Sequence, residues 1–384
     1  MAFSGKATYS AGSTLPEIVE DVADLVGIVA PVETPLLDAL GDPLAAATST
    51  RHEWLEDELL PNAGAINQAA LNDAAKNTAS FDVADGSVFR SGDLIQAEGS
   101  AEAILVTAVA GNTLTVARGY GASTRSPLVH EQKLTVLGNA QLEGAEAGAA
   151  RFTLRTRRSN YTQIFAATVQ VSGTEAAVRQ IGVDDEMDYQ KTNRLRELLR
   201  DLENTVINGV APATTPEGSA TVRRTMRGIL KSLSTNAMTS GNGYLPADNN
   251  LSEDHLNQAL RTIWEISGSK PDLIVCGGAQ KRRINGFVAS MQRFSPQDET
   301  FKKLVSTYES DYGVCRVVLS RYVPADAVVF LDSTRASVVP LMGRSFQFKP
   351  LAVTGDYQSG EVVGEYTLEL RNEKSHDVLR GLAM

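Results

Sequence analysis

The sequence predicts an α+β fold, because one long amphipathic helix separates a β-rich stretch from a stretch in which helices and strands alternate. The helix is expected over residues 184–208. At 100° per residue, six apolar side chains fall within an arc of about 120°: Met187, Leu195, Leu198, Leu199, Leu202 and Val206. At about 1.5 Å per residue this helix would be roughly 38 Å long, which suits a spine for the molecule.

The ends of the spine helix carry expected boundary signals. Asp184, Asp185 and Glu186 lie in its first turn, where negative charge favours the helix dipole. The three residues could also be taken as a general acid and base, but adjacent side chains at a helix start point apart, so we interpret them as capping charges. Gly209 follows the last apolar turn, and we expect it to form a left-handed cap.

Composition indicates a folded protein of two or three domains. The chain has 384 residues, of which 42% are hydrophobic and 21% charged. No apolar run reaches the roughly 18 residues that span a bilayer, and residues 1–13 show no signal leader, so we expect folding in a cytoplasm and no membrane partner. Cys276 and Cys315 lie in apolar runs typical of strands, which favours buried free thiols over a disulfide.

The net charge of −10 is concentrated at the start of the chain. Residues 1–80 hold twelve acidic residues against Lys6, Arg51 and Lys76, so the remainder is almost neutral. Nothing in the sequence resembles a basic surface that follows phosphates, which argues against sequence-specific DNA binding. Enclosure of DNA without tight binding remains compatible with this charge.

The first part of the chain reads as an arm followed by the two legs of a long hairpin. Residues 1–50 are rich in Ala, Gly, Thr and Pro, with one helix expected at residues 15–29, and would be ordered against a partner subunit. Residues 51–59 and 151–171 are expected to form strands. These two segments would form the legs of one extended hairpin.

A small barrel-like β unit is expected between the legs, at about residues 82–138. Strands are predicted at residues 94–97, 103–109, 114–117 and 133–137, with a hairpin turn at Gly111-Asn112. The segment Gly119-Tyr120-Gly121 has glycines suited to a phosphate loop. No Lys-Ser or Lys-Thr follows and no helix begins there, so we interpret this segment as a turn.

The chain after the spine helix predicts a mixed sheet covered by helices. A helix is expected in residues 221–234, a polar surface loop over 235–250, and a helix capped by Ser252. The strand at 273–276 is followed by a turn at Gly277-Gly278 and a helix through Ile284 and Phe287. Further strands are predicted at 314–319, 327–331, 337–341 and 365–371.

A search for catalytic chemistry returns no site, and we predict no enzyme activity, no cofactor and no metal. His52, His130, His255 and His376 have no paired spacing. No nucleophile elbow, phosphate-binding P-loop or dinucleotide-binding fingerprint occurs.

Two basic clusters are candidate contact surfaces. Arg151, Arg155, Arg157 and Arg158 would form either a solvated strand edge or a subunit contact with an acidic surface. The acidic candidates lie within residues 17–58, and those in the leg are Glu53, Glu56, Asp57 and Glu58. Lys281, Arg282 and Arg283 on a helix would form a solvated face or a face toward packaged DNA.

Several segments together resemble the major head protein family of tailed phages typified by phage SU10. They are the run Ser159-Asn160-Tyr161-Thr162-Gln163-Ile164-Phe165, the run Val171-Ser172-Gly173-Thr174, the start of the spine helix at Asp185-Glu186, residues 271–287 with Lys281-Arg282-Arg283-Ile284-Asn285, and residues 368–379. The resemblance covers most of the chain and is weak over residues 1–50. These are packing motifs, so they are specific in combination.

The resemblance implies an HK97-type capsid fold in which every predicted part has a place. Residues 1–50 would be the N-terminal arm and 51–172 the extended loop with its inserted β unit. Residues 173–224 and 346–384 would form the peripheral domain, and 225–345 the axial domain. The implied function is a major capsid protein that assembles into pentamers and hexamers and then into the icosahedral phage head around double-stranded DNA.

The resemblance also implies partners. No long helical segment precedes the arm, so we expect a separate scaffolding protein, no cleaved N-terminal peptide, and contacts with portal and decoration proteins. We expect no covalent crosslink between subunits. An encapsulin-like compartment shell would share the fold but enclose protein, and a soluble hydrolase with dispersed carboxylates is the alternative of a different class.

Overall fold

The computed structural model describes residues 34–384 except 44, 72, 147–149, 179–184, 240, 243–248 and 292–306. The described residues form two compact units: the first comprises those up to Trp54 together with Arg157–Met384, and the second those within Leu55–Thr156. The helix expected at residues 15–29 lies outside the described residues. The first unit contains α-helices and strands, as an α+β fold requires, and the described part of the second contains strands and two three-residue 3-10 helices.

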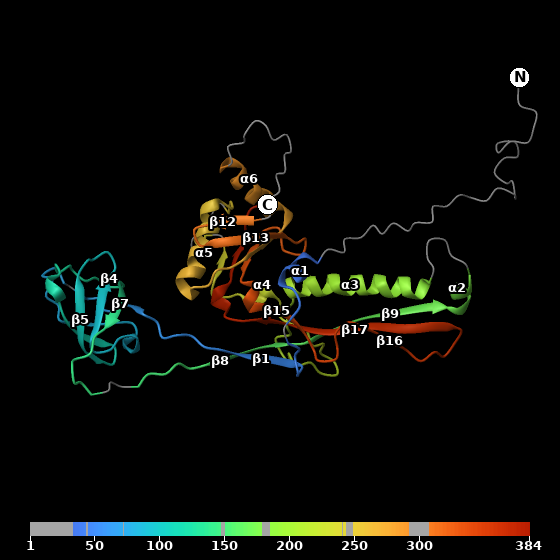
Figure 1. The fold of residues 1–384 in the computed structure, drawn as a ribbon, viewed down its shortest axis with the longest axis horizontal. Coiled ribbons are helices and arrows are strands. Elements are labelled where there is room, and N and C mark those ends of the chain that lie inside the picture. The colour runs from blue at the N-terminus through green and yellow to red at the C-terminus, as the bar shows by residue number, and fades with distance from the viewer. Residues whose placement is uncertain are drawn as a thin grey trace, which may run out of the picture. The chain divides into compact units, whose positions relative to one another are not determined.

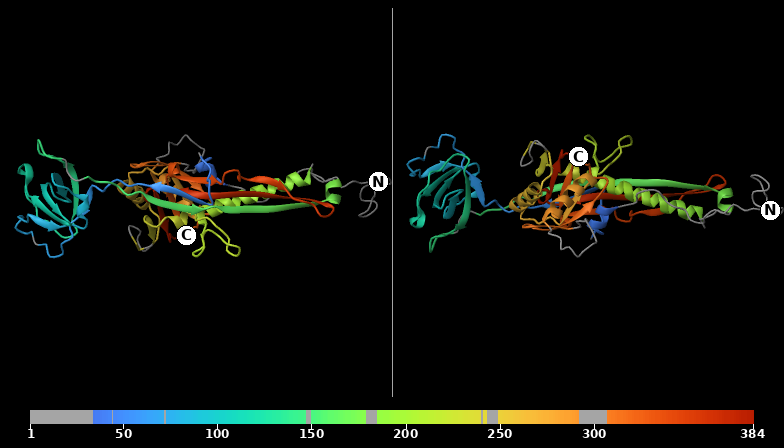
Figure 2. Two further views of the ribbon diagram at one scale, coloured as in Figure 1. Left: turned by 90° about the horizontal axis from the view of Figure 1, so that it is seen from below. Right: turned by 90° about the horizontal axis from the view of Figure 1, so that it is seen from above.

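The spine helix is α3, Glu186–Asn208, and it belongs to the first unit. Asp185 is its N-cap and accepts the amides of Met187 and Asp188, so the capping interpretation is confirmed for this residue. Buried residues on α3 include Leu198, Leu202 and Val206, which share the predicted apolar face. Figures 1 and 2 show α3 lying along strands β9, Gln163–Ser172, and β17, Tyr357–Leu370.

The prediction of a left-handed cap at Gly209 is wrong. Gly209 has φ −50° and ψ 142°, so its backbone is extended. A Cβ atom built on Gly209 would lie 2.5 Å from the Thr205 carbonyl oxygen and 2.7 Å from that of Met226. Glycine is needed here because two backbone segments approach closely, and not because of a positive φ.

Strand β17 is the centre of a four-stranded antiparallel sheet in the first unit. It pairs with β9 from Tyr357 opposite Ser172 to Tyr366 opposite Gln163. On its other side it pairs with β15, Ala336–Pro340, and β16, Gln347–Pro350. The predicted strand at 365–371 therefore begins earlier, at Tyr357, and β16 was missed because all four of its residues are exposed.

The first unit contains a second sheet, which is mixed and has six strands. The alternation of helices and strands in the sequence predicted a mixed sheet. Its order is β10-β18-β14-β11-β13-β12, with β10–β18 and β11–β13 parallel. The bounds are β10 Ala237–Thr239, β11 Leu273–Cys276, β12 Thr307–Ser310, β13 Gly313–Leu319, β14 Val328–Leu331 and β18 Asp377–Arg380. The loop expected over residues 235–250 therefore contains a short strand, β10.

This mixed sheet separates two hydrophobic cores. Leu273 and Val275 of β11 point into the core that contains α3, whereas Ile274 and Cys276 point into the core formed with α5 and α6. Both faces of β11 are buried, which explains its continuous apolar sequence. Helix α5 is Glu253–Ser267 with Ser252 as its N-cap, as predicted, and α6 is Gly278–Met291. Cys276 and Cys315 are buried free thiols, as predicted.

Three short helices complete the first unit. Helix α1, Pro35–Leu40, lies in the segment expected to be an arm, and its Leu36 is fully buried. Helix α2, Gly173–Ala177, follows β9, and α4, Ile229–Ser232, follows the loop after α3.

The two legs of the extended loop meet where β1, Arg51–Glu56, pairs with β8, Thr156–Tyr161.

The second unit is a six-stranded antiparallel sheet with its own core. The strand order is β2-β7-β4-β5-β6-β3, and a bridge between Ile66 and Val83 joins the two edges. The bounds are β2 Ala63–Ala65, β3 Ser80–Asp82, β4 Asp93–Ala97, β5 Ala103–Ala110, β6 Thr113–Ala117 and β7 Lys133–Asn139. The four predicted strands and the Gly111-Asn112 turn are confirmed, and the sheet starts earlier than residue 82.

Candidate functional site

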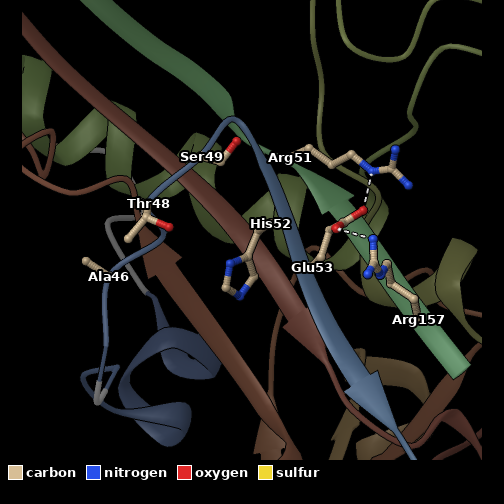
Figure 3. A pocket seen from close by; sticks show the side chains of 7 residues that line it. All are labelled: Ala46, Thr48, Ser49, Arg51, His52, Glu53 and Arg157. Carbon is tan, nitrogen blue, oxygen red and sulfur yellow. Dashed lines mark ion pairs between the residues drawn. The ribbon is translucent and has the colours of Figure 1, made fainter. Parts of the chain in front are cut away.

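The arginine cluster in the first unit is organised around Glu53 of β1. Figure 3 shows the Glu53 carboxylate between two guanidinium groups. Arg51 Nε lies 2.9 Å from Oε1, and Arg157 Nη1 of β8 lies 3.4 Å from Oε2. Two of the predicted contact residues, Glu53 and Arg157, are therefore already paired within one chain.

A polar hollow of about 620 Å³ surrounds this arrangement. It is lined by Ala46, Thr48, Ser49, Arg51, His52, Glu53 and Arg157 (Figure 3). His52 Nε2 lies 2.9 Å from Oε2 of Glu369, and this bond, with the Arg371 side chain, lowers the pKa of Glu369. The lining is thus charged and internally paired.

The arginines of the second unit also have partners in the same chain. Arg155 Nε lies 3.9 Å from Oδ2 of Asp57, which also accepts the Thr153 hydroxyl at 3.0 Å. Arg151 donates to the Ser87 carbonyl at 2.5 Å. Arg151 and Arg155 precede β8, so the strand ribbon expected from residue 151 begins only at Thr156.

The arginine side chains remain largely exposed in spite of these pairs. The side chain of Arg155 is 71% exposed and that of Arg157 67%. Exposed pairs of this kind stabilise a protein by about 0–1 kcal/mol, so they can exchange partners at small cost. Arg158, Glu56 and Glu58 also belong to the predicted set, and each has an interaction in the described part of the chain.

Side chains of the segment at residues 159–165, which carries part of the family resemblance, hold other segments of the first unit in place. Asn160 is buried, and its side-chain amide donates to the carbonyls of Arg227 at 2.9 Å and Leu368 at 2.8 Å. Its Oδ1 accepts the Arg227 amide at 2.9 Å, and Gln163 Oε1 accepts the Met226 amide at 3.2 Å. This segment therefore fastens the loop before α4 to β17, which no periodicity in the sequence reveals.

Glu365 of β17 completes this junction. It is 3% exposed and accepts the Thr162 hydroxyl and Arg224 Nη2, each at 2.6 Å, through Oε1. Arg344 Nε lies 2.8 Å from its Oε2. A buried carboxylate with two arginines is well compensated, so this side chain orders three separate segments.

The second basic cluster is divided by the structure. Lys281 is 8% exposed, and its Nζ donates to the Val317 carbonyl at 3.3 Å, so it packs beneath α6 and does not form a surface. Burial lowers the pKa of Lys281. Arg282 is exposed, and Arg283 contacts the Met384 carbonyl at 3.3 Å. Only Arg282 and Arg283 remain candidates for a DNA-facing surface.

The Gly119-Tyr120-Gly121 segment forms a tight turn, as predicted, but it includes the start of a three-residue 3-10 helix, Tyr120–Ala122, which was not expected. Gly119 and Gly121 have φ of 67° and 66°, and the Gly119 amide donates to Glu102 at 2.9 Å. The donor that a phosphate would need is therefore used by a carboxylate of the protein. Glu102 itself belongs to a buried ion cluster with Asp73 and Arg118, which sequence spacing did not reveal.

The model of the SU10 major capsid protein family matches residues 4–383 of the chain. The chain belongs to this family. No protein of curated function matches it by sequence. The match includes the Asn160–Gln163 run and its partners on β17, whose contacts fasten the first unit together.

Solved capsid structures share the fold of this capsid protein. A capsid chain of cyanophage A-1(L) has 13% identity and a TM-score of 0.54, with 96% of this chain and 98% of that chain covered. The capsid of a native GTA particle has 10% identity and a TM-score of 0.53, with 99% of this chain and 100% of that chain covered. A structure of Microbacterium phage Oxtober96 has 12% identity and a TM-score of 0.50, with 94% of this chain and 95% of that chain covered. The HK97-like fold is thereby confirmed.

Family membership identifies a structural protein of the virion. The chain is a major capsid protein that self-assembles and forms the icosahedral head. In the part of the chain that the structure describes, no group of three or more His, Cys, Asp or Glu could hold a metal ion. Among the described helices, none combines the length and apolar character needed to cross a bilayer.

Proposed function

We propose that the capsid protein forms pentamers and hexamers that enclose double-stranded DNA, and that the extended loop and the arm make the contacts between neighbours. Residues 1–50 serve as the arm and 51–172 as the extended loop with its inserted unit. Residues 173–224 with 346–384 form the peripheral domain, and 225–345 the axial domain. The observation that carries the proposal is the set of exposed, weakly paired charges on the two legs.

In this proposal the charged residues of the legs pair within one chain before assembly and with a neighbouring subunit after it. In a single chain, Arg157 pairs with Glu53 and Arg155 with Asp57. In the shell, acidic and basic leg residues of neighbouring subunits exchange partners, and because each intrachain pair is exposed the exchange costs about 0–1 kcal/mol per pair. The proposal gives the remaining charged residues of the two legs, Arg151, Arg158, Glu56 and Glu58, the same role.

Apolar side chains on the second unit support the same contact. Phe152 and Leu154 are 77% and 80% exposed, and Leu59 is 88% exposed. Exposed apolar side chains that gather in one patch mark protein contacts, and Phe152 and Leu154 lie two residues apart. Burial against a neighbour would contribute more free energy than the charges, which would set the register of the contact.

The partners of the shell follow from the same proposal. Assembly takes place in the host cytoplasm with a separate scaffolding protein, and the finished head carries a portal and decoration proteins. Arg282 and Arg283 meet DNA phosphates without reading sequence, which suits a protein of net charge −10.

A complementation experiment tests the leg contact. One variant carries Arg155→Glu and Arg157→Glu, and the other carries Glu53→Lys and Asp57→Lys. Each alone is expected to form few shells, since like charges would meet between subunits. Co-expression should restore shells that contain both variants, because opposite charges then meet across the contact. Arg194→Glu, in a half-buried ion pair of α3 that lies outside the legs, is the matched control and should assemble normally.

Two results would contradict the leg contact. Normal shells from each variant expressed alone would show that these charges have no role in assembly. Loss of shells without recovery on co-expression, together with lower melting temperatures of both monomers, would show that the pairs serve folding within one chain. Shells filled with protein instead of DNA would favour a compartment function.

A further inference from the structure

Helix α1 is capped by a side chain that lies far away in the sequence. The helix has six residues, too few to be stable alone, and its N-cap residue Thr34 makes no side-chain capping bond. The amides of Leu36 and Leu37 donate instead to Oε1 and Oε2 of Glu203 on α3, each at 3.1 Å. Glu203 thus satisfies two of the amides that every helix start leaves open.

The opposite end of α1 is held by a positive charge. Arg316 of β13 donates from Nη2 to the Ala39 carbonyl at 3.3 Å. A carboxylate at the start and a guanidinium at the end both match the helix dipole, which favours this orientation of α1 over its reverse. Leu36, between the two charges, is fully buried in the same core as Leu202.

Glu203 is costly to bury unless α1 is in place. Its residue exposure is 0%, and no salt bridge of Glu203 occurs within the described part of the chain. Besides the two amides, its only other polar contact there is the Ser320 hydroxyl at 3.2 Å. Burial raises the pKa of Glu203, the two amide bonds oppose this rise, and the nearby charge of Asp38 adds to it.

An uncompensated buried charge strongly destabilises a folded protein, so the carboxylate and α1 depend on each other. We propose that Glu203 is the positioning residue that docks α1, with Arg316 fixing its direction, and thereby fixes the place at which the arm is anchored on the first unit. The inference rests on the proposed function in one respect: the arm must reach a neighbouring subunit for its anchoring place to matter in assembly.

Hydrogen exchange of the unassembled full-length chain tests the docking. In Glu203→Gln, one charged acceptor becomes a neutral amide with a single acceptor oxygen. A lost bond to a charged group corresponds to about tenfold or more in local opening, so the peptide containing α1 should exchange about tenfold faster. Exchange of β9 and β17 should stay unchanged. Glu197→Gln, the same chemical change at a half-buried position of the same helix, should alter neither.

A second substitution restores the cap locally. Thr34→Asp, added to Glu203→Gln, gives α1 an N-cap side chain of its own. Exchange at α1 should then return toward the wild-type rate. Shell yield should fall in Glu203→Gln and recover in the double variant.

The outcomes separate docking from assembly. Unchanged exchange at α1 in Glu203→Gln would overturn the docking role, as would an equal rise over the whole first unit or a failure of Thr34→Asp to restore protection. A rise confined to α1 with a normal shell yield would leave the docking in place and overturn the proposed role of the arm in assembly.

Discussion

Gly209 and Gly228 pack backbone against backbone at the end of the spine helix. The amide of Gly228 donates to the carbonyl of Gly209 at 2.9 Å. A Cβ atom on Gly228 would lie 2.5 Å from the Gly209 nitrogen and 2.7 Å from the Thr205 carbonyl oxygen. The loop anchored by Asn160 therefore returns to α3 at a point where only hydrogen atoms fit.

Gly228→Ala and Gly209→Ala should each destabilise the first unit by about 2 kcal/mol or more, because backbone must move to admit a methyl group. Urea unfolding of the monomer measures this change. Gly286→Ala is the control: it lies in α6 with nothing within 4 Å of the added Cβ, and should stabilise by about 0.5–1 kcal/mol. Equal effects at Gly228 and Gly286 would contradict the close approach.

Asn160→Asp should destabilise the first unit by about 2–3 kcal/mol relative to wild type. Asn160→Ala should destabilise it less. The aspartate would place an acceptor against the carbonyls of Arg227 and Leu368, where the asparagine donates. Thermal unfolding of both variants measures the order. Asn204→Asp, exposed on α3 and an acceptor in the native structure, should change little. A milder effect for Asp than for Ala at position 160 would refute the assigned amide orientation.

Stability of the first unit should fall as the pH drops from 6.5 toward 4. Burial lowers the pKa of His376 from 6.5 to about 4, so the unfolded chain binds a proton in this window while the folded chain does not. This difference amounts to about 3 kcal/mol at the acid end. Unfolding free energies at several pH values should lose most of this slope in His376→Gln and keep it in His130→Gln. An unchanged slope in His376→Gln would exclude this histidine as its source.

Arg118→Met should unfold the second unit locally, because Asp73 and Glu102 would remain as buried charges without a cation. Breaking one partner of a buried ion group costs about 3–5 kcal/mol. Hydrogen exchange over β4–β6 measures the loss. Adding Asp73→Asn and Glu102→Gln should recover much of it, and exposed Arg125→Met should be neutral. Full protection in Arg118→Met alone would show that the cluster does not stabilise the unit.

The long-range pattern of the fold could be predicted from sequence where periodicity is strong. The spine helix was expected at 184–208 and is described from Glu186 to Asn208, and β11 and β13 match their predicted positions closely. Strands β10 and β18 were missed because they are short and owe their structure to pairing with each other and with β14. Tertiary contacts, not local preference, decide such elements.

The contacts of single side chains were less predictable. The arginine cluster was visible in the sequence, but its pairing with Glu53 and Asp57 depends on how the two legs align. The burial of Lys281 could not be read from a run of three basic residues, since only the packing of α6 on β13 decides which one points inward. Glu203 gave no signal, because a charged residue beside an apolar face usually marks the solvated side.

Electron microscopy of the natively produced particle is the most direct test of the head-forming function and of the proposed DNA content. Closed icosahedral shells of five- and six-membered rings, filled with DNA, are the expected result. A persistent monomer or dimer under assembly conditions would contradict the capsid function, and closed shells filled with protein would contradict the enclosure of DNA.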